Sequence, residues 1–270
     1  MYDHHPRAAE SAVEPGLLVE ERRRRICDLL QESGRVTVVA LARRFATSTV
    51  TIRADLTALE RIGAVVRSHG GALLPREGLD QPLTVKETLH HAEKVRIARL
   101  AVALIRDGET IILDSGTTTA EIAKQICEAP LQSINVITNA LNVAMLLASA
   151  PLVRLIMPGG ILRRESDSLS GHIGEAALAE LRADRLFLGA DAIDPALGVM
   201  TPHLPEAQLN LKMIEIARQV VAVADSSKLM RRNISVIARV EQLDTLITDS
   251  AAPPAVVDEL RRRGVEVLLA

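Results

Sequence analysis

The sequence predicts two domains: a small one built from short helices and a hairpin, and a larger α/β domain with a mostly parallel sheet. Three observations support this division. Residues 17–76 carry eleven arginines and six acidic residues, although the whole chain of 270 residues has a formal net charge of -2. Three helical patterns and one hairpin pattern fill that basic segment. Beyond it, short apolar runs alternate with helical patterns to the end of the chain. A basic segment joined to an acidic remainder indicates an anion-binding module followed by a domain with another task.

Two helices are predicted at the start of the small domain, after a polar leader at residues 1–16 that we expect to be disordered. The first helix runs from Leu17 to about Ser33, where Gly34 ends it. It carries a run of four arginines, residues 22–25, which we expect to face solvent. The second helix begins after Thr37 and is joined by a two-residue turn to a third, which predicts a helix-turn-helix.

The third helix lies in the stretch TSTVTIRADLTALERIG, residues 47–63, and begins with β-branched residues, which are poor helix formers. Ser48 can cap it, and an apolar stripe at helical spacing would face the core, which turns Val50 and Arg53 outward. Short hydroxyl side chains, an arginine and an outward valine in the first turns suit a helix that reads DNA in the major groove. The alternative is that the β-branched residues only pack against a neighbouring element.

A hairpin pattern follows directly, in the stretch AVVRSHGGALLP at residues 64–75. A hairpin next to a recognition helix is a wing, whose tip can grip phosphates or the minor groove. The histidine at the tip could equally be an ordinary exposed loop residue. The residues predicted to contact DNA are Ser48, Thr49, Val50, Thr51, Arg53 and Thr57 from the third helix, and Arg67 and His69 from the wing.

The stretch VTVVALARRFATSTVTIRADLTALERIGAVVRSHGGALL resembles the winged helix-turn-helix of the DeoR family of bacterial transcription regulators. The matching pieces are Thr51-Ile52-Arg53, Asp55-Leu56, Leu59-Glu60 and His69-Gly70-Gly71-Ala72. Ala54 departs from the pattern, because the family often has a second basic residue there, and one phosphate or base contact is thereby in doubt. Thr47 stands where the family often has valine, which concerns packing only. The resemblance implies that residues 17–74 bind a double-stranded DNA operator.

A linker is predicted at residues 75–85, which mix proline, glycine and charge. The larger domain, residues 86–270, then begins with a long helix at residues 86–105. The alternation after it argues for a parallel sheet with helices on both faces. The predicted strands are 110–113, 135–138, 153–157, 186–189, 220–224, 243–248 and 265–269, and the helices between them include 119–127, 141–148, 175–181, 206–217 and 255–263.

Polar and glycine-bearing loops follow these strands at the carboxyl edge of the sheet, where α/β proteins bind ligands. The loop DSGTTT, residues 114–119, lies between a strand and a helix. Its glycine permits close backbone approach, its hydroxyls donate hydrogen bonds and the helix N-terminus favours an anion, so it predicts a phosphate cradle. Taken alone, it could be an ordinary capped turn. Four further loops, at residues 138–142, 158–160, 189–191 and 224–228, together favour a pocket for one small polar ligand.

These loops extend the resemblance over nearly the whole chain after residue 17. The DeoR sensor domain is similar in fold to ribose-5-phosphate isomerase and related sugar-phosphate enzymes, which implies a ribose-5-phosphate-isomerase-like fold and a phosphorylated sugar effector here. The implied contact residues are Asp114, Ser115, Gly116, Thr117, Thr118, Thr119, Asn139, Gly160, Asp191 and Lys228. The stretches DSGTTT, MPGGILRR and LFLGADAID look most like regulators of amino-sugar use, such as that of N-acetylgalactosamine.

The resemblance implies a repressor of a sugar or amino-sugar catabolic operon, bound to DNA as a homo-oligomer (dimer or tetramer) and released by its effector. Two other functions compete with it. A sugar-phosphate isomerase fused to a DNA-binding domain would need a carboxylate base, for which Asp191 or Asp114 could serve. The Lys-Gly-Gly-Gly signature of those isomerases is missing, however, since Lys228 follows Asp-Ser-Ser. The third possibility is a larger domain that only oligomerises and binds no ligand.

Composition disfavours several classes of protein. Cys27 and Cys127 are the two cysteines, too few for a disulfide framework or a zinc cluster, and we expect both to be buried. The N-terminal stretch lacks the basic and apolar regions of a signal peptide, and no apolar run is long enough to span a membrane. We therefore expect a cytoplasmic protein that needs no cofactor or metal and has no membrane partner.

Overall fold

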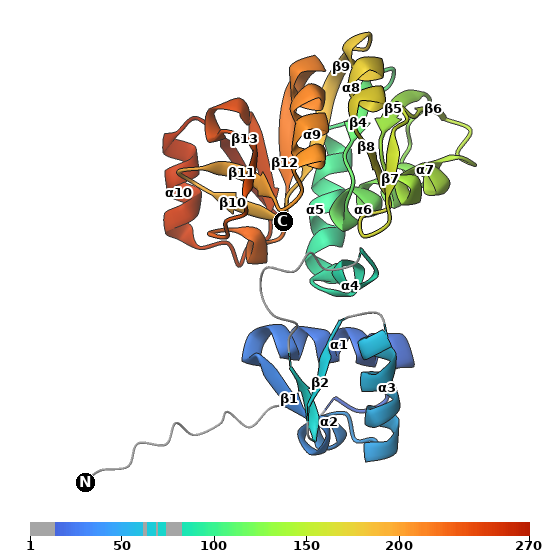
Figure 1. Cartoon of the computed structure of the whole chain (residues 1–270), viewed down its shortest axis with the longest axis vertical. Helices are drawn as coiled ribbons and strands as arrows, with labels where there is room; N and C mark the ends of the chain where they lie inside the picture. The colour runs from blue at the N-terminus through green and yellow to red at the C-terminus, as the bar shows by residue number, and fades with distance from the viewer. Residues whose placement is uncertain (1–13, 62–63, 69, 74–82) are drawn as a thin grey trace. The chain divides into compact units, whose positions relative to one another are not determined.

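The computed structural model describes residues 14–61, 64–68, 70–73 and 83–270, and the chain divides into two units. The first unit ends at Leu89, and the second runs from His90 to Ala270. Figure 1 shows the helices and strands of each unit. The predicted leader and linker fall largely outside the described part of the chain, at residues 1–13 and 74–82.

The first unit combines helices with a three-stranded antiparallel sheet (Figure 1). Its helices are α1 (Val19–Ser33), α2 (Val38–Arg44), α3 (Thr49–Arg61) and α4 (Leu83–Thr88), and its strands are β1 (Arg35–Thr37), β2 (Val66–Ser68) and β3 (Gly71–Leu73). The hairpin β2–β3 is the predicted wing. Strand β1, which no sequence pattern indicated, pairs with β3 in the order β1-β3-β2. The predicted winged helix-turn-helix is confirmed.

The helices of this unit begin and end where the sequence places capping residues. The hydroxyl of Thr37 accepts the N–H of Ala40 at 3.2 Å before α2, and the hydroxyl of Ser48 accepts the N–H of Thr51 at 3.0 Å before α3. Gly34 ends α1 in the left-handed conformation, with a φ of 72°. Local hydrogen bonds therefore set where α2 and α3 begin, and a glycine sets where α1 ends.

The second unit is built on a seven-stranded parallel sheet in the order β15-β14-β12-β9-β4-β5-β6. Its strands are β4 (Thr110–Leu113), β5 (Ile134–Thr138), β6 (Val153–Ile156), β9 (Ala183–Gly189), β12 (Ala217–Val223), β14 (Thr245–Thr248) and β15 (Glu266–Leu269). Its helices are α5 (His91–Ala103), α6 (Thr117–Ile126), α7 (Leu141–Leu147), α8 (His172–Ala179), α9 (Leu204–Ile216) and α10 (Pro254–Arg262). Each of the seven predicted strands is present within a few residues.

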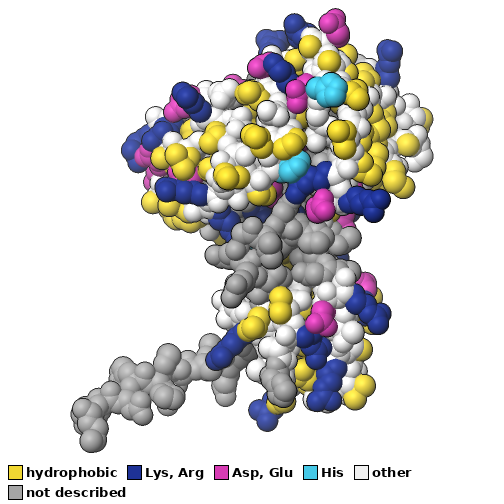
Figure 2. Space-filling view, in the orientation of Figure 1, with side chains coloured by type: hydrophobic (Ala, Val, Ile, Leu, Met, Phe, Trp, Pro, Cys, Tyr) yellow, Lys and Arg dark blue, Asp and Glu magenta, His cyan; other side chains and the backbone are white. Residues whose placement is uncertain are grey.

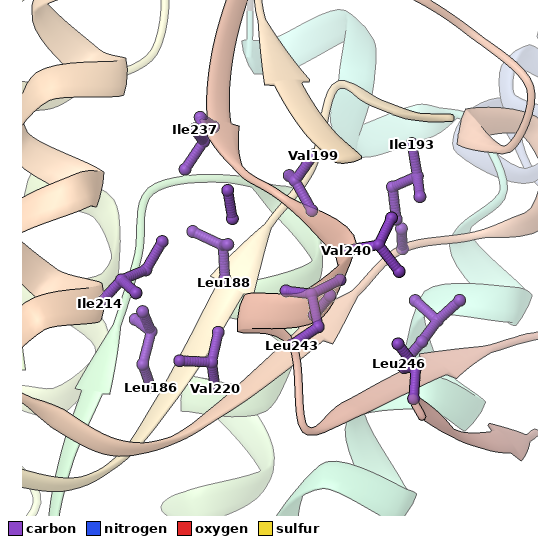
Figure 3. Packing of buried hydrophobic residues seen from close by; sticks show 14 of the residues in the cluster. Leu186, Leu188, Ile193, Val199, Ile214, Val220, Ile237, Val240, Leu243 and Leu246 are labelled. Carbon is purple, nitrogen blue, oxygen red and sulfur yellow. The ribbon is translucent and has the colours of Figure 1, made fainter. Parts of the chain in front are cut away.

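Alternation along the central strands divides the core of this unit into two clusters, one on each face of the sheet. Leu186 and Ala222 belong to the cluster covered by α9 and α10. Their chain neighbours Phe187 and Val221 belong to the cluster covered by α5, α6 and α7. Figure 3 shows the first cluster, in which Leu186 lies beside Ile214 of α9. Helices on both faces are therefore confirmed.

Two small antiparallel sheets of the second unit were not predicted. One contains β10 (Ala192–Asp194), β11 (Gly198–Thr201) and β13 (Ser235–Ala238), and the other is the hairpin of β7 (Ile161–Arg163) and β8 (Ser168–Ser170). These strands have three or four residues, too few for an alternating pattern, and they fall outside the regular succession of strand and helix that indicated equally short strands of the large sheet. Both sheets follow loops at the carboxyl edge of the large sheet, so they shape the region where a ligand was predicted.

Three of the local predictions that are wrong concern a helix break, a cysteine and the leader. The helix expected at residues 86–105 is instead the pair α4 and α5, because His90 between them has a positive φ of 50°. Cys127 is exposed rather than buried, because it lies just after α6 and beyond the buried face of that helix. Glu14, which was assigned to a disordered leader, forms an ion pair with Arg44 at 2.7 Å.

Candidate nucleic-acid interface and ligand site

Helix α3 carries an exposed polar face opposite its buried stripe. Ile52 and Leu56 are fully buried, whereas the side chain of Val50 is 70% exposed. At 100° per residue, Thr49, Val50, Arg53 and Thr57 fall within about 100° of the helix circumference. Of the six residues predicted from this helix and its cap, Ser48, Thr49, Val50, Arg53 and Thr57 are exposed and Thr51 is half-buried. Figure 2 shows basic side chains over this unit with few acidic ones between them.

The wing is joined to this helix. Nη1 of Arg67 on β2 donates to the backbone oxygen of Arg53 at 3.3 Å, which brings two predicted residues side by side. His69, also predicted here, lies outside the described residues. A Cβ on Gly71 would lie 2.0 Å from the backbone oxygen of Val36, so only glycine allows β3 to pack this closely against β1.

A buried charge cluster holds α3 against α1. Asp55 is 2% exposed, and its two carboxylate oxygens accept Nε of Arg22 at 2.6 Å and Nε of Arg23 at 3.1 Å. Arg22 is itself buried, so the expectation that the arginine run of residues 22–25 faces solvent is wrong for its first member. Asp55 could have indicated this burial from the sequence, because it is an acidic residue beside the apolar stripe of α3. A buried carboxylate needs a cationic partner.

In the second unit, the carboxyl edge of the sheet contains a switch point. The chain proceeds from β4 outward through β5 to β6 and then returns to the other side of β4 at β9. Ligands of open α/β sheets bind where the strand order reverses in this way. The loop after β4 meets the end of β9 there: the N–H of Gly189 donates to Oδ2 of Asp114 at 3.2 Å. A Cβ on Gly189 would lie 2.8 Å from the backbone oxygen of Ser115, so glycine allows this contact.

Helix α6 begins at the same edge. Its N-cap is Gly116, with a φ of 138°, and no described side chain caps the helix. The hydroxyl of Thr119 donates to the backbone oxygen of Gly116 at 3.0 Å, and the side chains of Thr117 and Thr118 are largely buried beside it. An uncapped helix start leaves backbone N–H groups available to water or an anion. The loop thus has the helix start and the glycine that a phosphate cradle requires.

Asp114 is the centre of a buried network beside this helix start. Its Oδ1 accepts the N–H of Ser115 at 2.7 Å, and its Oδ2 accepts Nδ2 of Asn210 at 3.2 Å. The hydroxyl of Ser115 donates to Oε1 of Glu206 at 2.9 Å. Burial and then the nearby Glu206 carboxylate raise the pKa of Asp114 well above its usual value, although N–H donors of Ser115 and Gly189 act in the opposite direction.

Four residues of this network were missed by the sequence analysis: Arg163, His203, Glu206 and Asn210. Nη1 of Arg163 donates to Oε2 of Glu206 at 2.9 Å, and both side chains are nearly buried. Nδ1 of His203 is buried and makes no hydrogen bond with a described residue; burial and then the charge of Arg163 lower the pKa of this imidazole. The sequence feature that could have indicated this network is the pair Glu206 and Asn210, two polar residues one helical turn apart on α9.

Asn139 and Gly160, both predicted to contact the ligand, serve different structural purposes. Asn139 follows β5 and is fully buried; its Nδ2 donates to the backbone oxygen of Leu169 at 3.2 Å. Its Oδ1 makes no hydrogen bond with any described residue. A Cβ on Gly160 would lie 2.7 Å from the backbone oxygen of Ser170, so this glycine is required for packing against β8.

Asp191 and Lys228 follow β9 and β12 at this edge, and both are half-buried. Oδ2 of Asp191 accepts the hydroxyl of Thr201 at 3.4 Å. Lys228 lies in a 3-10 turn, Ser226–Lys228, next to Asp225. Burial raises the pKa of Asp225, but the charges of Lys228, His90 and Lys94 outweigh it and lower that pKa overall. A cation therefore lies at the carboxyl end of β12.

Among the described residues, no group of three or more His, Cys, Asp or Glu side chains is arranged to hold a metal ion. None of the helices that the structure describes is both long and apolar enough to pass through a lipid bilayer. The two candidate sites are thus the exposed face of α3 with its wing, and the carboxyl edge of the large sheet.

The chain matches two family models along most of its length. Residues 22–77 match the DeoR-like helix-turn-helix domain, and residues 89–250 match the DeoR C terminal sensor domain. A protein of Escherichia coli O157:H7, assigned as an aga operon transcriptional repressor, is 41% identical over 92% of this chain and 93% of its own. The transcriptional repressor GlcR of Bacillus subtilis is 34% identical over 93% of this chain and 96% of its own. The glycerol-3-phosphate regulon repressor of Escherichia coli is 31% identical over 92% and 98%.

Solved structures with some likeness to the chain include two ribose-5-phosphate isomerases. One, in complex with phospho-erythronic acid, has a TM-score of 0.40 and 19% identity over 52% of this chain and 54% of that chain. The other, from Methanocaldococcus jannaschii, has a TM-score of 0.38 and 22% identity over 51% and 53%.

Proposed function

The chain belongs to the DeoR family of transcription regulators, and we propose that it represses a sugar or amino-sugar catabolic operon under the control of a phosphorylated sugar. It is a DNA-binding regulator rather than an enzyme, since relatives that it matches along nearly their whole length are named transcriptional regulators and repressors. The observation that carries the proposal is the exposed face of α3, held beside the wing by Arg67 and anchored to α1 through Asp55.

The exposed face of α3 supports a DNA contact in the major groove. Arg53 can form paired hydrogen bonds with a guanine, and Val50 can contact a thymine methyl group. The hydroxyls of Thr49 and Thr57 can bond phosphates or base edges. Arg67, next to Arg53, can add a phosphate contact from the wing. Proposed contacts from Ser48 and Thr51 are weaker candidates, because their hydroxyls already bond each other at 2.8 Å in the helix cap.

The carboxyl edge of the large sheet supports an anionic sugar as the effector. The uncapped start of α6 at Gly116 can accept the phosphate group. Arg163 and Lys228 supply positive charge, while Asp114 and Glu206 supply acceptors for sugar hydroxyls. Relatives named for the aga operon and the glycerol-3-phosphate regulon favour a phosphorylated carbohydrate, and the greater identity of the former favours an amino sugar.

A homo-oligomer would match this mode of control. Two or more copies of α3 would bind repeated or palindromic half-sites, because oligomer symmetry is mirrored in the operator. The effector would bind two arrangements of the oligomer with different affinities and so shift the population that fits DNA. A regulator of this kind would act in the cytoplasm, where its operator DNA lies.

The DNA contact is tested by selecting bound sequences from a random DNA pool with the full-length protein and then measuring affinities by fluorescence anisotropy at fixed salt. Replacing Arg53 by alanine should weaken the selected site by about 1–3 kcal/mol, or about 5- to 150-fold, and relax one base preference. Arg61→Ala is the matched control, since Arg61 is exposed about 12 Å farther along the same helix. Equal, small effects of both substitutions would contradict the assignment of Arg53.

The effector site is tested by calorimetry with a panel of phosphorylated sugars and by their effect on operator binding. The double substitution Thr117→Val and Lys228→Ala should preserve operator affinity and abolish the response to the sugar. A retained response would contradict the proposed pocket. The absence of heat with every phosphorylated sugar, together with an unchanged operator affinity, would favour a second unit that only oligomerises.

A further inference from the structure

A polar cavity of about 160 Å³ lies at the amino-terminal edge of the parallel sheet, opposite the proposed effector site. The residues that line it are Arg106, Glu109, Asp184, Arg185, Arg218 and Gln219. They precede or begin β4, β9 and β12, whereas Gly116 and Lys228 follow the far ends of such strands. Because β9 and β12 are each seven residues long, about 20 Å separates the two edges. The cavity is therefore distinct from the effector site.

Arg185 supplies a buried donor that the protein leaves unused. The residue is 8% exposed, and its Nη1 donates to the backbone oxygen of Leu104 at the end of α5. Its Nη2 donates to Oε1 of Gln219 at 3.1 Å and lies 3.5 Å from Oε1 of Glu109. Its Nε is buried and has no hydrogen-bond partner among the described residues. A buried donor without a partner is destabilising, so donors of this kind normally have one.

The two carboxylates that line the cavity are already engaged. Glu109 accepts the N–H of Arg106 at 3.2 Å with one oxygen and faces Arg185 with the other. Oδ2 of Asp184 accepts the N–H of Thr110 at 2.9 Å. Within the described part of the chain, no hydrogen bond or ion pair engages the guanidinium groups of Arg106 and Arg218. Three arginines against two carboxylates leave the cavity with an excess of positive charge.

We propose that this cavity binds a small oxyanion, either inorganic phosphate or the phosphate group of a metabolite. The volume accommodates several waters or one group of phosphate size. Arg106 and Arg218 would bond the oxygens of the anion from the rim, and a rotation of the Arg185 guanidinium would bring its shielded Nε donor to one of them. Binding would satisfy the unpaired donor and neutralise the excess charge, and would stabilise the starts of the three central strands.

The test uses the full-length protein carrying Thr117→Val and Lys228→Ala, so that the proposed effector cradle is disabled, and inorganic phosphate as the calorimetric probe. This protein should bind one phosphate per chain. Adding Arg106→Gln and Arg218→Gln should weaken that binding at least tenfold, because two charge-assisted hydrogen bonds are lost. Adding Arg154→Gln and Arg231→Gln, two exposed arginines outside the cavity, is the matched control and should change the affinity less than about twofold.

No phosphate binding by the cradle-disabled protein, or equal loss in both arginine pairs, would overturn the proposal. Crystals soaked in selenate give an independent readout: an anomalous peak within hydrogen-bond distance of Nε of Arg185 supports the site, and peaks only at lattice contacts, adventitious ions, contradict it. Competition between inorganic phosphate and a phosphorylated sugar at this site would identify a metabolite as the source of the anion. Binding of inorganic phosphate alone would identify the free ion.

Discussion

Replacing Asp55 by alanine should destabilise the first unit severely while leaving the second unit intact. Asp55 lies on α3 but not on its exposed face, and its carboxylate is buried between Arg22 and Arg23 of α1. Without it, Arg22 would remain buried, and its remaining acceptor among the described residues would be the backbone oxygen of Leu17 at 3.3 Å. Helix α3 would lose its charged attachment to α1.

The magnitude follows from these contacts. Removing one partner of a buried ion pair costs about 3–5 kcal/mol. Arg23 adds little, because its side chain is 27% exposed and keeps Glu20 at 3.0 Å. Alanine favours the helix over aspartate by about 0.5 kcal/mol, which offsets a small part. The net loss is about 3 kcal/mol. This is a large share of the free energy of unfolding of so small a unit, which is about 5–10 kcal/mol.

Thermal and denaturant unfolding of the full-length protein should therefore show an early transition in the variant, and hydrogen exchange should assign it to residues of the first unit. Glu60→Ala is the control, because Glu60 is exposed on the same helix and its removal changes the net charge equally. That substitution should shift stability by less than about 0.5 kcal/mol. Loss of an acidic residue favours DNA binding electrostatically in both variants. If Asp55→Ala binds DNA more weakly while Glu60→Ala binds it equally or more tightly, unfolding of the first unit is the cause of the weaker binding. Equal unfolding midpoints for the two variants would refute the reasoning.

Three further outcomes are expected. Gly71→Ala should detach the wing from β1, because its Cβ would lie 2.0 Å from the backbone oxygen of Val36; operator affinity should fall, and unchanged affinity in the anisotropy assay would contradict this. Gly189→Ala should displace the loop at Ser115 at a cost of about 1–3 kcal/mol, so calorimetry should show loss of sugar-phosphate binding while operator binding persists. Because burial and then Glu206 raise the pKa of Asp114, the folded chain keeps this proton after the unfolded chain has lost it. Stability of the second unit should thus fall by up to about 1.4 kcal/mol per pH unit as pH rises above 3.8, and Asp114→Asn should remove that slope; parallel stability curves for variant and wild type would show the reasoning to be mistaken.

The large elements were predictable because their signals are local. A central parallel strand such as β12 is buried on both faces and reads as an apolar run, and α3 has a clear stripe at helical spacing. The strands of the two small sheets were missed because they have three or four residues and lie outside the regular succession of strand and helix, which is the pattern that indicated the equally short β4 and β14. His90 could not be recognised as a break, since a positive φ at a non-glycine residue leaves no reliable trace in sequence.

For the candidate sites too, local features were predicted from the sequence and long-range pairings were not. The loop from Asp114 to Thr119 is contiguous and was recognised as one motif, and the face of α3 followed from helical geometry. Glu206 bonds Ser115 across 91 positions of the chain, and Arg163 bonds Glu206 across 43. Pairings of that span depend on the packing of α9 and β7 against the sheet edge, which no periodic pattern specifies. The pairing of Asp55 with Arg22 was also missed, but it could have been predicted from the sequence. A carboxylate beside the apolar stripe of a helix is buried and therefore needs a cationic partner.

The most direct measurement is operator binding by the full-length protein, followed by anisotropy, during titration with phosphate esters of N-acetylgalactosamine and galactosamine and with the unphosphorylated sugars. A phosphorylated sugar should weaken operator binding by about 1–3 kcal/mol in the wild type and leave the protein with Thr117→Val and Lys228→Ala unaffected. The unphosphorylated sugars should have no effect. Sequence-specific DNA binding that no phosphorylated sugar alters, or a response that survives in the double variant, would contradict the proposed control of the DNA-binding unit by the second unit.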